Sequence, residues 1–361
     1  MSTPADDRPT TAPRATAAPS ADAPVVVVGA GLAGVACARA VAAAGHPVEL
    51  VDRGRRIGGR MASRRFDGRP VDTGASYFTV SDPRFAAVVD RWEAAGLARP
   101  WTDTFHVLEA GAPPRLASGP VRWATPGGLR TLVEDLAAPF EVRQAEVERV
   151  DLAAADHGAH DGAGEGAAAG LLVDGRPASA VALAMPDEQA RRLLGTGLAA
   201  EAEQLRRPSE PVLALVAWWP ERCWGDDLLA ATGRPLDGAF VNGDPDVAWI
   251  ADDGRRRADD APVLVAHTTP ERAARHLADP ASAGPAVLAA LQRLLGIPDE
   301  PAGHHVHRWS LARPVGERDA AYLLSSRRLG VCGDGWGPVS KVEGAWLSGT
   351  ALGEALVAAL P

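Results

Sequence analysis

The sequence predicts an α/β protein whose first domain is built around a parallel sheet, and three observations support this class. A β-branched run, Val25–Val28, is followed by a glycine-rich turn, an Ala-rich helical stretch and a second strand at residues 47–52. A short continuous apolar run of this kind is typical of a strand buried on both faces of a parallel sheet. A second predicted strand-and-turn at residues 329–334 precedes a clear C-terminal helix at residues 343–360. The third observation is length, because 361 residues exceed the roughly 250–300 at which one core usually stops growing.

Composition limits the function classes. Hydrophobic residues make up 46% and charged residues 23%, which is typical of a folded globular protein. A net charge of -9 argues against nucleic-acid binding, because such proteins carry a basic surface. The three cysteines form no C-x-x-C pattern, so the sequence predicts neither a disulfide framework nor a cysteine zinc site.

The N-terminal residues 1–23 are rich in Pro, Ala, Thr, Ser and Asp and almost lack large apolar side chains. Such a segment cannot bury enough surface to offset its ordering entropy, so we expect a disordered tail. It lacks the apolar region of a secretory signal, and no run of about 20 apolar residues follows it. We therefore expect a cytoplasmic protein with no membrane partner.

The first chemical motif is Gly29-x-Gly31-x-x-Gly34, placed between the predicted strand and helix. Gly29 permits a tight turn, Gly31 lets the backbone approach a pyrophosphate, and Gly34 allows close packing of helix and strand. The helix N-terminus then offers free N–H groups to the phosphates. Asp52 ends the second strand, where it can accept hydrogen bonds from an adenosine ribose. This β-α-β unit predicts a Rossmann-like dinucleotide-binding domain.

Two further motifs point to a flavin dinucleotide. Gly58-Gly59-Arg60 supplies another backbone turn and an arginine that can pair with phosphates or with a carboxylate. Gly333-Asp334 ends a strand, and an Asp there can hold a ribityl hydroxyl. Glu343-Gly344-Ala345 opens a helix whose N–H groups can face the flavin ring, where reduction builds negative charge. The other arginines of this region, Arg55, Arg56, Arg64 and Arg65, are interpreted as a solvated basic loop.

These motifs together resemble the renalase family within the amine-oxidase-like flavoproteins. The resemblance rests on residues 29–60, 72–79, 307–309 and 333–349 and covers nearly the whole chain after the tail. It implies non-covalent FAD and oxidation of 2- or 6-dihydro isomers of NAD(P)H. Hydride would pass to the flavin, β-NAD(P)+ would be released, and O2 would be reduced to H2O2. The implied partners are a dihydronicotinamide dinucleotide and O2.

The resemblance also implies a domain division and a set of cofactor contacts. The FAD-binding domain would be discontinuous, at residues 24–80, 120–190 and 322–361, with an inserted α+β substrate domain on a mixed sheet at 81–119 and 191–321. The predicted FAD-binding residues are Gly29, Gly31, Leu32, Ala33, Gly34, Asp52, Arg53, Gly59, Arg60, Met61, Gly74, Ala75, Ser76, Val147, Gly333, Asp334, Val342, Glu343, Gly344 and Ala345.

The substrate side is less defined by the sequence. We predict no certain catalytic residue, since hydride transfer is the flavin's own chemistry, and we select Trp249, His307 and Trp309 as pocket walls. Tyr77 and Tyr322 are the only tyrosines and Lys341 is the only lysine, which disfavours the two-tyrosine, one-lysine arrangement typical of amine oxidases. Two alternatives stay open: an FAD-dependent amine oxidase or desaturase, and a flavin-binding redox sensor with little turnover.

Overall fold

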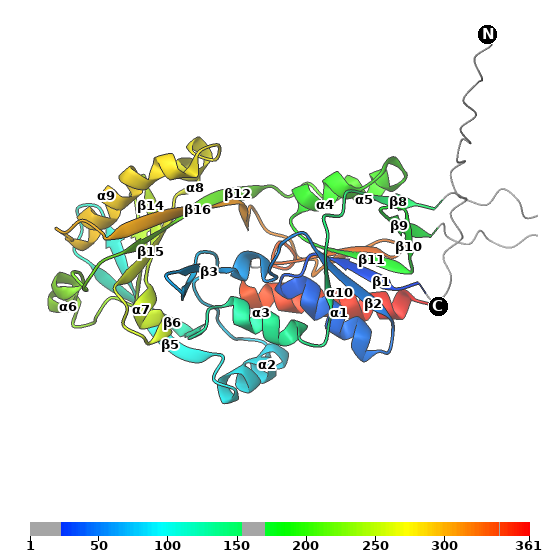
Figure 1. Ribbon diagram of the computed structural model, residues 1–361, viewed down its shortest axis with the longest axis horizontal. Helices are drawn as coiled ribbons and strands as arrows, with labels where there is room; N and C mark the ends of the chain where they lie inside the picture. The colour runs from blue at the N-terminus through cyan, green and yellow to red at the C-terminus, as the bar shows by residue number, and fades with distance from the viewer. Residues whose placement is uncertain (1–22, 154–169, 339) are drawn as a thin grey trace, which may run out of the picture.

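The computed structural model describes residues 23–153, 170–338 and 340–361, and it forms two lobes (Figure 1). Apart from their end residues, the predicted tail at 1–23 and the low-complexity stretch at 153–170 lie outside the described residues. Among the described residues, no helix combines the length and the apolar character needed to cross a membrane.

The first lobe contains a six-stranded sheet that is parallel except at one edge, where the first two strands of the order pair antiparallel. The strand order is β17 (Leu323–Leu324), β18 (Leu329–Cys332), β11 (Ala180–Ala184), β1 (Val25–Val28), β2 (Val48–Asp52) and β7 (Val142–Gln144). Every residue of β1 is buried, as expected for a strand between two covered faces. The predicted β-α-β unit and the C-terminal strand and helix are therefore confirmed, and they meet in one sheet.

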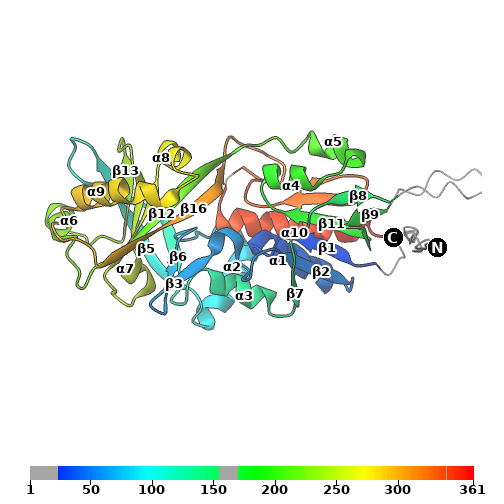
Figure 2. The ribbon, with the colours of Figure 1, turned by 45° about the horizontal axis from the view of Figure 1, so that its top comes forward.

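Helices cover one face of this sheet and a small antiparallel sheet covers the other (Figure 2). The helices are α1 (Leu32–Ala43), α2 (Pro83–Ala94), α3 (Arg130–Ala137) and α10 (Val342–Ala359). On the other face lie β8 (Val150–Leu152), β9 (Leu171–Val173), β10 (Arg176–Ala178), α4 (Asp187–Leu193), η2 (Thr196–Leu198) and α5 (Ala199–Ala202). The helices α1 and α10 cross closely, because a Cβ on Gly349 would lie 2.0 Å from the Ala33 carbonyl oxygen.

The second lobe is a seven-stranded mixed sheet in which only β13 and β5 pair in parallel. Its order is β16 (Gly303–Pro314), β12 (Ser209–Trp218), β15 (Val263–Thr268), β14 (Val247–Asp252), β13 (Gly238–Asn242), β5 (Arg99–Glu109) and β6 (Arg115–Ala124). One face packs against a helical layer. That layer consists of α6 (Asp226–Thr232), α8 (Pro270–Arg275), η3 (Pro280–Ala283) and α9 (Gly284–Leu295). The predicted α/β class with a second domain on a mixed sheet is thus confirmed.

The opposite face of this sheet meets the first lobe. It contacts a short hairpin, β3 (Ser63–Phe66) and β4 (Arg69–Asp72), which follows the single turn η1 (Gly59–Met61). A short helix, α7 (Asp253–Arg257), extends β14 toward the same junction. The η1 turn, the hairpin after it and α7 therefore lie where the two lobes meet.

The predicted domain boundaries differ from the structure in two places. Residues 81–119 were assigned to the substrate domain, yet α2 packs into the core of the first lobe through the apolar stripe Phe85, Val88, Val89 and Trp92. The indole Nε1 of Trp92 also donates to Asp135 on α3 at 2.9 Å. The boundary at residue 120 falls inside β6, which belongs to the second sheet. The chain therefore enters the second lobe after α2 and returns to the first lobe after β6.

Candidate functional site

The glycine turn after β1 presents the start of α1 to open space. Gly29 has a φ of +105°, and a Cβ on Gly34 would lie 1.8 Å from the Gly29 carbonyl oxygen. Both positions therefore require glycine for the turn to close. Gly31 is the N-cap of α1 and no side chain caps that end, so the first N–H groups, from Leu32 and Ala33 onward, are available to an anion.

A second glycine turn faces the first. Gly58 and Gly59 have φ values of +117° and +50°, and the Gly58 amide donates to the Ala30 carbonyl at 3.0 Å. A Cβ on Gly59 would lie 3.4 Å from the Gly31 Cα, so the two turns approach each other without side chains between them. This is a cradle that fits a pyrophosphate approached by bare backbone. Met61, the last residue of η1, is buried beneath it.

The carboxylate of Asp52 contacts the backbone of this cradle. One carboxylate oxygen accepts from the Ala30 amide and the other from the Gly54 amide, both at 2.7 Å. Each oxygen keeps a lone pair with which to accept from a ribose hydroxyl. Beside it, Arg53 is exposed and lies 3.6 Å from Glu146, while Val147 is buried. The Ala145 amide donates to the Asp52 carbonyl at 3.0 Å, so the predicted FAD-binding residues Asp52, Arg53 and Val147 lie on neighbouring segments.

The C-terminal motif reaches the same cradle from the other side. Asp334 pairs with Arg60 at 2.5 Å, which joins residues 274 positions apart in one ion pair. The Gly333 amide donates to the Ser348 hydroxyl at 3.0 Å, and this bond fixes the turn against α10. Arg60 thus pairs with a carboxylate, which is one of the two partners predicted for it.

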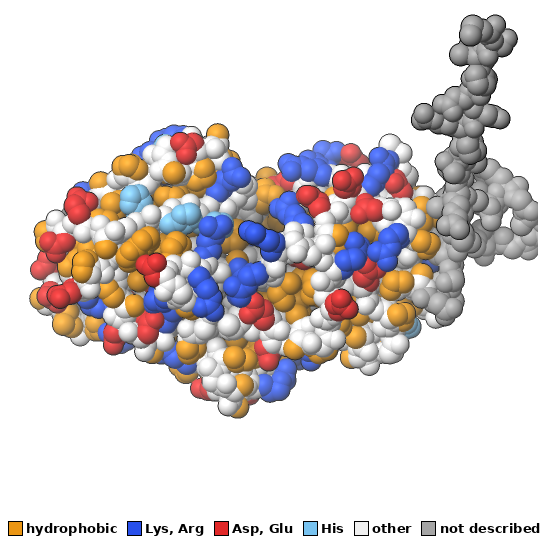
Figure 3. Space-filling model, viewed as in Figure 1, with side chains coloured by type: hydrophobic (Ala, Val, Ile, Leu, Met, Phe, Trp, Pro, Cys, Tyr) orange, Lys and Arg blue, Asp and Glu red, His pale blue; other side chains and the backbone are white. Residues whose placement is uncertain are grey.

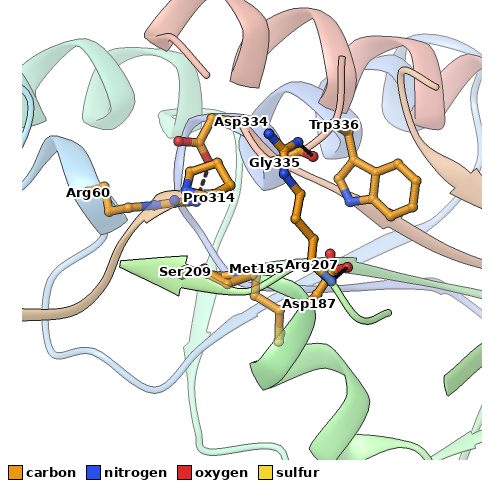
Figure 4. Close-up of a pocket in the computed structure, with 10 residues that line it drawn as sticks. Arg60, Met185, Asp187, Arg207, Ser209, Pro314, Asp334, Gly335 and Trp336 are labelled. Atoms are coloured by element: carbon orange, nitrogen blue, oxygen red, sulfur yellow. Dashed lines mark hydrogen bonds and ion pairs between the residues drawn. The ribbon is translucent and has the colours of Figure 1, made fainter. Parts of the chain in front are cut away.

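Figure 4 shows a pocket at this point, lined by Arg60 and Asp334 together with Arg207 and Trp336. Arg207 donates to the carbonyls of Gly335 and of the 315–316 turn, and it comes from the segment that enters β12. Residues from both lobes therefore line this pocket. Neither Arg207 nor Trp336 is predicted from the sequence as a site residue, because no local motif marks them.

The carboxylate of Glu343 is bound by the protein itself. Its side chain is buried and accepts from the Ser81 amide at 2.7 Å, the Ser81 hydroxyl at 2.6 Å and the Asp82 amide at 2.7 Å. The carboxylate therefore ties the start of α10 to the start of α2. Only the backbone of Val342, Glu343, Gly344 and Ala345 at the helix N-terminus is left to face a flavin ring.

Residues 73–76 form the boundary between the two lobes. The Ala75 amide donates to the Arg60 carbonyl at 2.9 Å, and a Cβ on Gly74 would lie 2.0 Å from the same oxygen. Two tryptophans of the second sheet hold the segment: Trp309 donates to the Thr73 carbonyl at 2.8 Å, and Trp249 donates to the Ser76 hydroxyl at 3.0 Å. Gly74, Ala75 and Ser76 are therefore adjacent to Arg60 and to two of the predicted pocket walls.

The strand register aligns the third pocket residue with the others. His307 on β16 pairs with Ala214 on β12, Ala214 pairs with His267 on β15, and His267 pairs with Trp249 on β14. Directly paired residues of neighbouring strands point to the same face of a sheet. Trp249 also pairs with Phe240 on β13. We call Phe240, Trp249, His267, Ala214 and His307 the wall row, and it contains no carboxylate and no lysine.

Both histidines of the wall row stay neutral at neutral pH. Burial, together with the charge of Arg256, lowers the pKa of His267 to about 4. Burial also lowers the pKa of His307 to about 4, with further contributions from Arg64, His305 and Arg308. The Nε2 of His267 is shielded from solvent and has no hydrogen-bond partner among the described residues. The wall therefore offers uncharged imidazoles.

The neutral state of His267 predicts a loss of stability in mild acid. An unfolded histidine binds a proton near pH 6.5 and folded His267 does so only near pH 4, so between these values the unfolded chain binds more protons. The free energy of unfolding should therefore fall as pH drops through this window, by about 2 kcal/mol at pH 5 for this residue. In His267→Gln, the free energy of unfolding measured with denaturant should fall about 2 kcal/mol less between pH 7.5 and pH 5 than it does in the wild type. Equal differences in both proteins would contradict the assignment.

An aromatic cluster that the sequence analysis did not single out adjoins the wall row. Tyr77 lies 5.8 Å from Trp249 and 5.2 Å from Phe105 between ring centroids, and Trp101 lies 5.2 Å from Phe105. Burial raises the pKa of Tyr77, although the neighbouring Arg122 opposes this. The cluster joins residues from the first lobe and from β5, so only the folded arrangement brings it to the site.

Comparisons with known proteins identify the family. Residues 27–92 match the NAD(P)-binding Rossmann-like domain, and residues 105–354 match the flavin containing amine oxidoreductases. The chain belongs to the flavin-containing amine oxidoreductase family. It is a flavin-dependent oxidoreductase, and its cofactor is FAD, for which the paired glycine turns, Asp52 and Asp334 are a fitting set of residues. The narrower renalase family is not shown by these matches.

Individual relatives match over shorter stretches. Hydroxyneurosporene desaturase from Rubrivivax gelatinosus is 50% identical over 66 residues, and putrescine oxidase from Kocuria rosea is 39% identical over 66 residues. Each match covers 18% of this chain and only 13% or 14% of the relative.

Solved structures agree in fold over almost the whole chain. Cyclohexylamine oxidase from Brevibacterium oxydans IH-35A matches with a TM-score of 0.70 at 15% identity, and a putrescine oxidase solved with putrescine bound matches with 0.67 at 16%. Both matches cover 93% of this chain and 99% of the other. The two-lobe arrangement described above is therefore that of known flavin amine oxidases.

Proposed function

We propose that the protein oxidises a small molecule by taking a hydride from a carbon next to an uncharged nitrogen. The observation that carries the proposal is the wall row, which faces the residues predicted to hold the flavin and contains two neutral histidines and two large aromatic side chains. When bound, FAD accepts the hydride and then passes two electrons to O2, which forms H2O2 with the transferred hydrogen and one further proton.

The residues of the site determine which nitrogen compounds suit it. The wall row has no carboxylate to pair with an ammonium ion and no lysine, and the sole lysine of the chain, Lys341, is exposed at the N-cap of α10. A charged amine bound here would lose its hydration without gaining a partner. Burying an unpaired neutral polar group costs about 1–3 kcal/mol, and burying an unpaired charge costs more. An amine would therefore react in its neutral form, and its nitrogen lone pair would assist departure of the hydride.

The protein contributes orientation and exclusion of water. Trp249 and Trp309 are each held in place by a hydrogen bond to the 73–76 segment, so their rings cannot turn without breaking that bond. The aromatic walls keep the substrate against one face of the flavin, where the reacting carbon must approach to about 3–3.5 Å. Within the amine oxidase or desaturase alternative that the sequence left open, this favours the amine oxidase, and it agrees with the family match.

A second candidate is oxidation of the 2- or 6-dihydro isomers of NAD(P)H, as the resemblance to renalases implies. The absence of a carboxylate and a lysine from the wall row supports it too, because the ring nitrogen of a dihydronicotinamide carries no charge at any working pH. Here the product is an aromatic nicotinamide, and no water is needed to complete the reaction.

Stopped-flow reduction of the FAD-loaded protein under nitrogen tests these proposals. We expect cyclohexylamine, putrescine or a 2- or 6-dihydro isomer of NAD(P)H to bleach the flavin, and air to restore its colour with release of H2O2. An amine substrate should react faster as pH rises, since its neutral fraction grows, whereas a dihydronicotinamide should show no such rise. If none of these donors bleaches the flavin, the protein is instead the flavin-binding redox sensor that the sequence allowed.

A further inference from the structure

Positively charged side chains gather in the middle of the face shown in Figure 3, where the two lobes meet. Four arginines at this junction have carboxylate partners. The pairs are Arg56–Glu134, Arg60–Asp334, Arg69–Asp253 and Arg313–Glu210. Arg64, Arg65, Arg130 and Arg207 are in none of the ion pairs among the described residues. The last three donate to backbone carbonyls, whereas the contact of Arg64 is a histidine ring.

The β3 strand directs Arg64 toward the second sheet. Phe66, two residues later on the same side of the strand, packs against Trp218 and His305 with ring centroids 5.6 Å and 5.5 Å apart. The guanidinium Nη1 of Arg64 lies 3.2 Å from the His305 Nε2. Arg64 is exposed, so its remaining N–H groups are free to bind a ligand. Arg64 is therefore solvated, as interpreted from the sequence, and it also contacts the other lobe.

Arg64 also lies at one end of a row of aromatic side chains on β16. His305, His307 and Trp309 alternate along β16 and share the face that looks toward the first lobe. Trp309 at one end donates to the Thr73 carbonyl, and Arg64 contacts His305 at the other end. The charge of Arg64 acts on His307, which lies between them. A molecule lying along this strand would have one end beside residues 73–76 and the other beside an arginine without a carboxylate partner.

We propose that Arg64 binds an anionic group of the substrate, a carboxylate or a phosphate, while the ring of that substrate lies against the aromatic walls. The planar guanidinium fork suits either group, and charge-assisted hydrogen bonds are the stronger kind. This inference rests on the proposed function, because it assigns the substrate class of the same pocket.

Binding of small ring compounds to the FAD-loaded protein tests this without turnover. Benzoate, phenyl phosphate and neutral benzamide are titrated while the visible absorbance of the flavin reports binding. We expect one of the two anions to bind about tenfold or more tightly than benzamide, as a charge-assisted hydrogen bond would produce. Which anion binds tighter identifies carboxylate or phosphate as the preferred group. In Arg64→Gln the preference should fall below about threefold, and Arg64→Lys should keep part of it.

Arg65→Gln is the matched control. Arg65 is the next residue, it points to the opposite side of β3, and it donates to the Gly68 carbonyl at 2.6 Å, so its loss should leave the preference unchanged. The proposal is overturned if Arg64→Gln keeps the wild-type preference, or if the wild type binds neither anion more tightly than benzamide. Flavin bleaching under nitrogen is a separate measurement. An anion preference in a protein that no donor reduces would refute the proposed function alone, and reduction without a preference would refute the anion site alone.

Discussion

The Gly31→Glu variant is expected to fold as the wild type does and to be purified without its flavin. Gly31 has a φ of -78°, which any residue adopts, and a Cβ there would lie 3.9 Å from the nearest neighbour, the Gly59 Cα. The chain itself therefore tolerates a side chain at this position. That side chain would occupy the space between the two glycine turns, where the pyrophosphate is expected, and its negative charge would repel the phosphates.

The visible absorbance of the flavin relative to protein absorbance measures this loss, and far-ultraviolet circular dichroism checks the fold. We expect FAD affinity to fall at least 100-fold. Ala43→Glu adds the same charge at the exposed far end of α1 and should keep its flavin. Gly34→Val should behave differently from both, because its Cβ would collide with the Gly29 carbonyl oxygen and the turn could not close. If Gly31→Glu remained as yellow as the wild type, the phosphate position would be wrong.

The part of the site that the sequence predicted is the part built by local motifs. The turn at Gly29, the helix that follows it and Asp52 lie within one short β-α-β unit, where spacing alone determines which groups converge. The Gly333-Asp334 turn could be included in the predicted site because a strand precedes it and a helix follows it. Its pairing with Arg60 shows that the Gly58-Gly59-Arg60 motif and the Gly333-Asp334 motif do meet.

The residues that the sequence did not indicate depend on the pairing of distant strands. Nothing near His267 marks it, and it joins His307 and Trp249 only because β12, β15 and β14 pair in one register. Arg64 was interpreted as solvated because its neighbours are polar, and its contact with His305 spans 241 positions. The assignment of α2 to the wrong domain has the same cause, since its apolar stripe does not reveal which core it enters.

The strongest example of such a distant arrangement is a buried ion-pair cluster around Asp253. Its carboxylate is fully buried and pairs with three arginines: Arg69 at 2.5 Å, Arg257 at 3.0 Å, and Arg256. Arg257 in turn pairs with buried Asp72 of β4 at 2.8 Å. The cluster therefore joins α7 of the second lobe to the β3–β4 hairpin of the first.

Asp253→Asn is expected to destabilise the protein by about 3–5 kcal/mol, the usual cost of removing one partner from a buried charge pair. Asparagine has nearly the same shape, so the loss would come from the charges of Arg256 and Arg257, which would remain buried without enough compensation. The matched control is Asp259→Asn. Asp259 is exposed and pairs with Arg69 at 2.8 Å, and loss of an exposed pair should cost only about 0.2–1 kcal/mol. Denaturant unfolding of the two variants at pH 7 gives the comparison, and similar midpoints for both would contradict the prediction.

The pH dependence of stability supplies an independent check. Burial alone would raise the pKa of Asp253, but the charges of Arg256, Arg257 and Arg69 outweigh it and hold the pKa far below its ordinary value. The stabilisation is therefore complete above the unfolded pKa of about 4 and is lost as pH falls below it. Asp253→Asn should lose less stability than the wild type between pH 5 and pH 2.

The same variant should also affect the flavin site. Arg256 donates to the Ser76 carbonyl at 3.1 Å and to the Asp72 carbonyl at 3.3 Å, so it holds the ends of the segment that lies beside Arg60. If Asp253 no longer fixes Arg256, this segment loses an anchor, and the flavin spectrum of Asp253→Asn should change while that of Asp259→Asn does not. A buried charge cluster would then fix the geometry at the junction of the two lobes, where an apolar contact would allow them to slide.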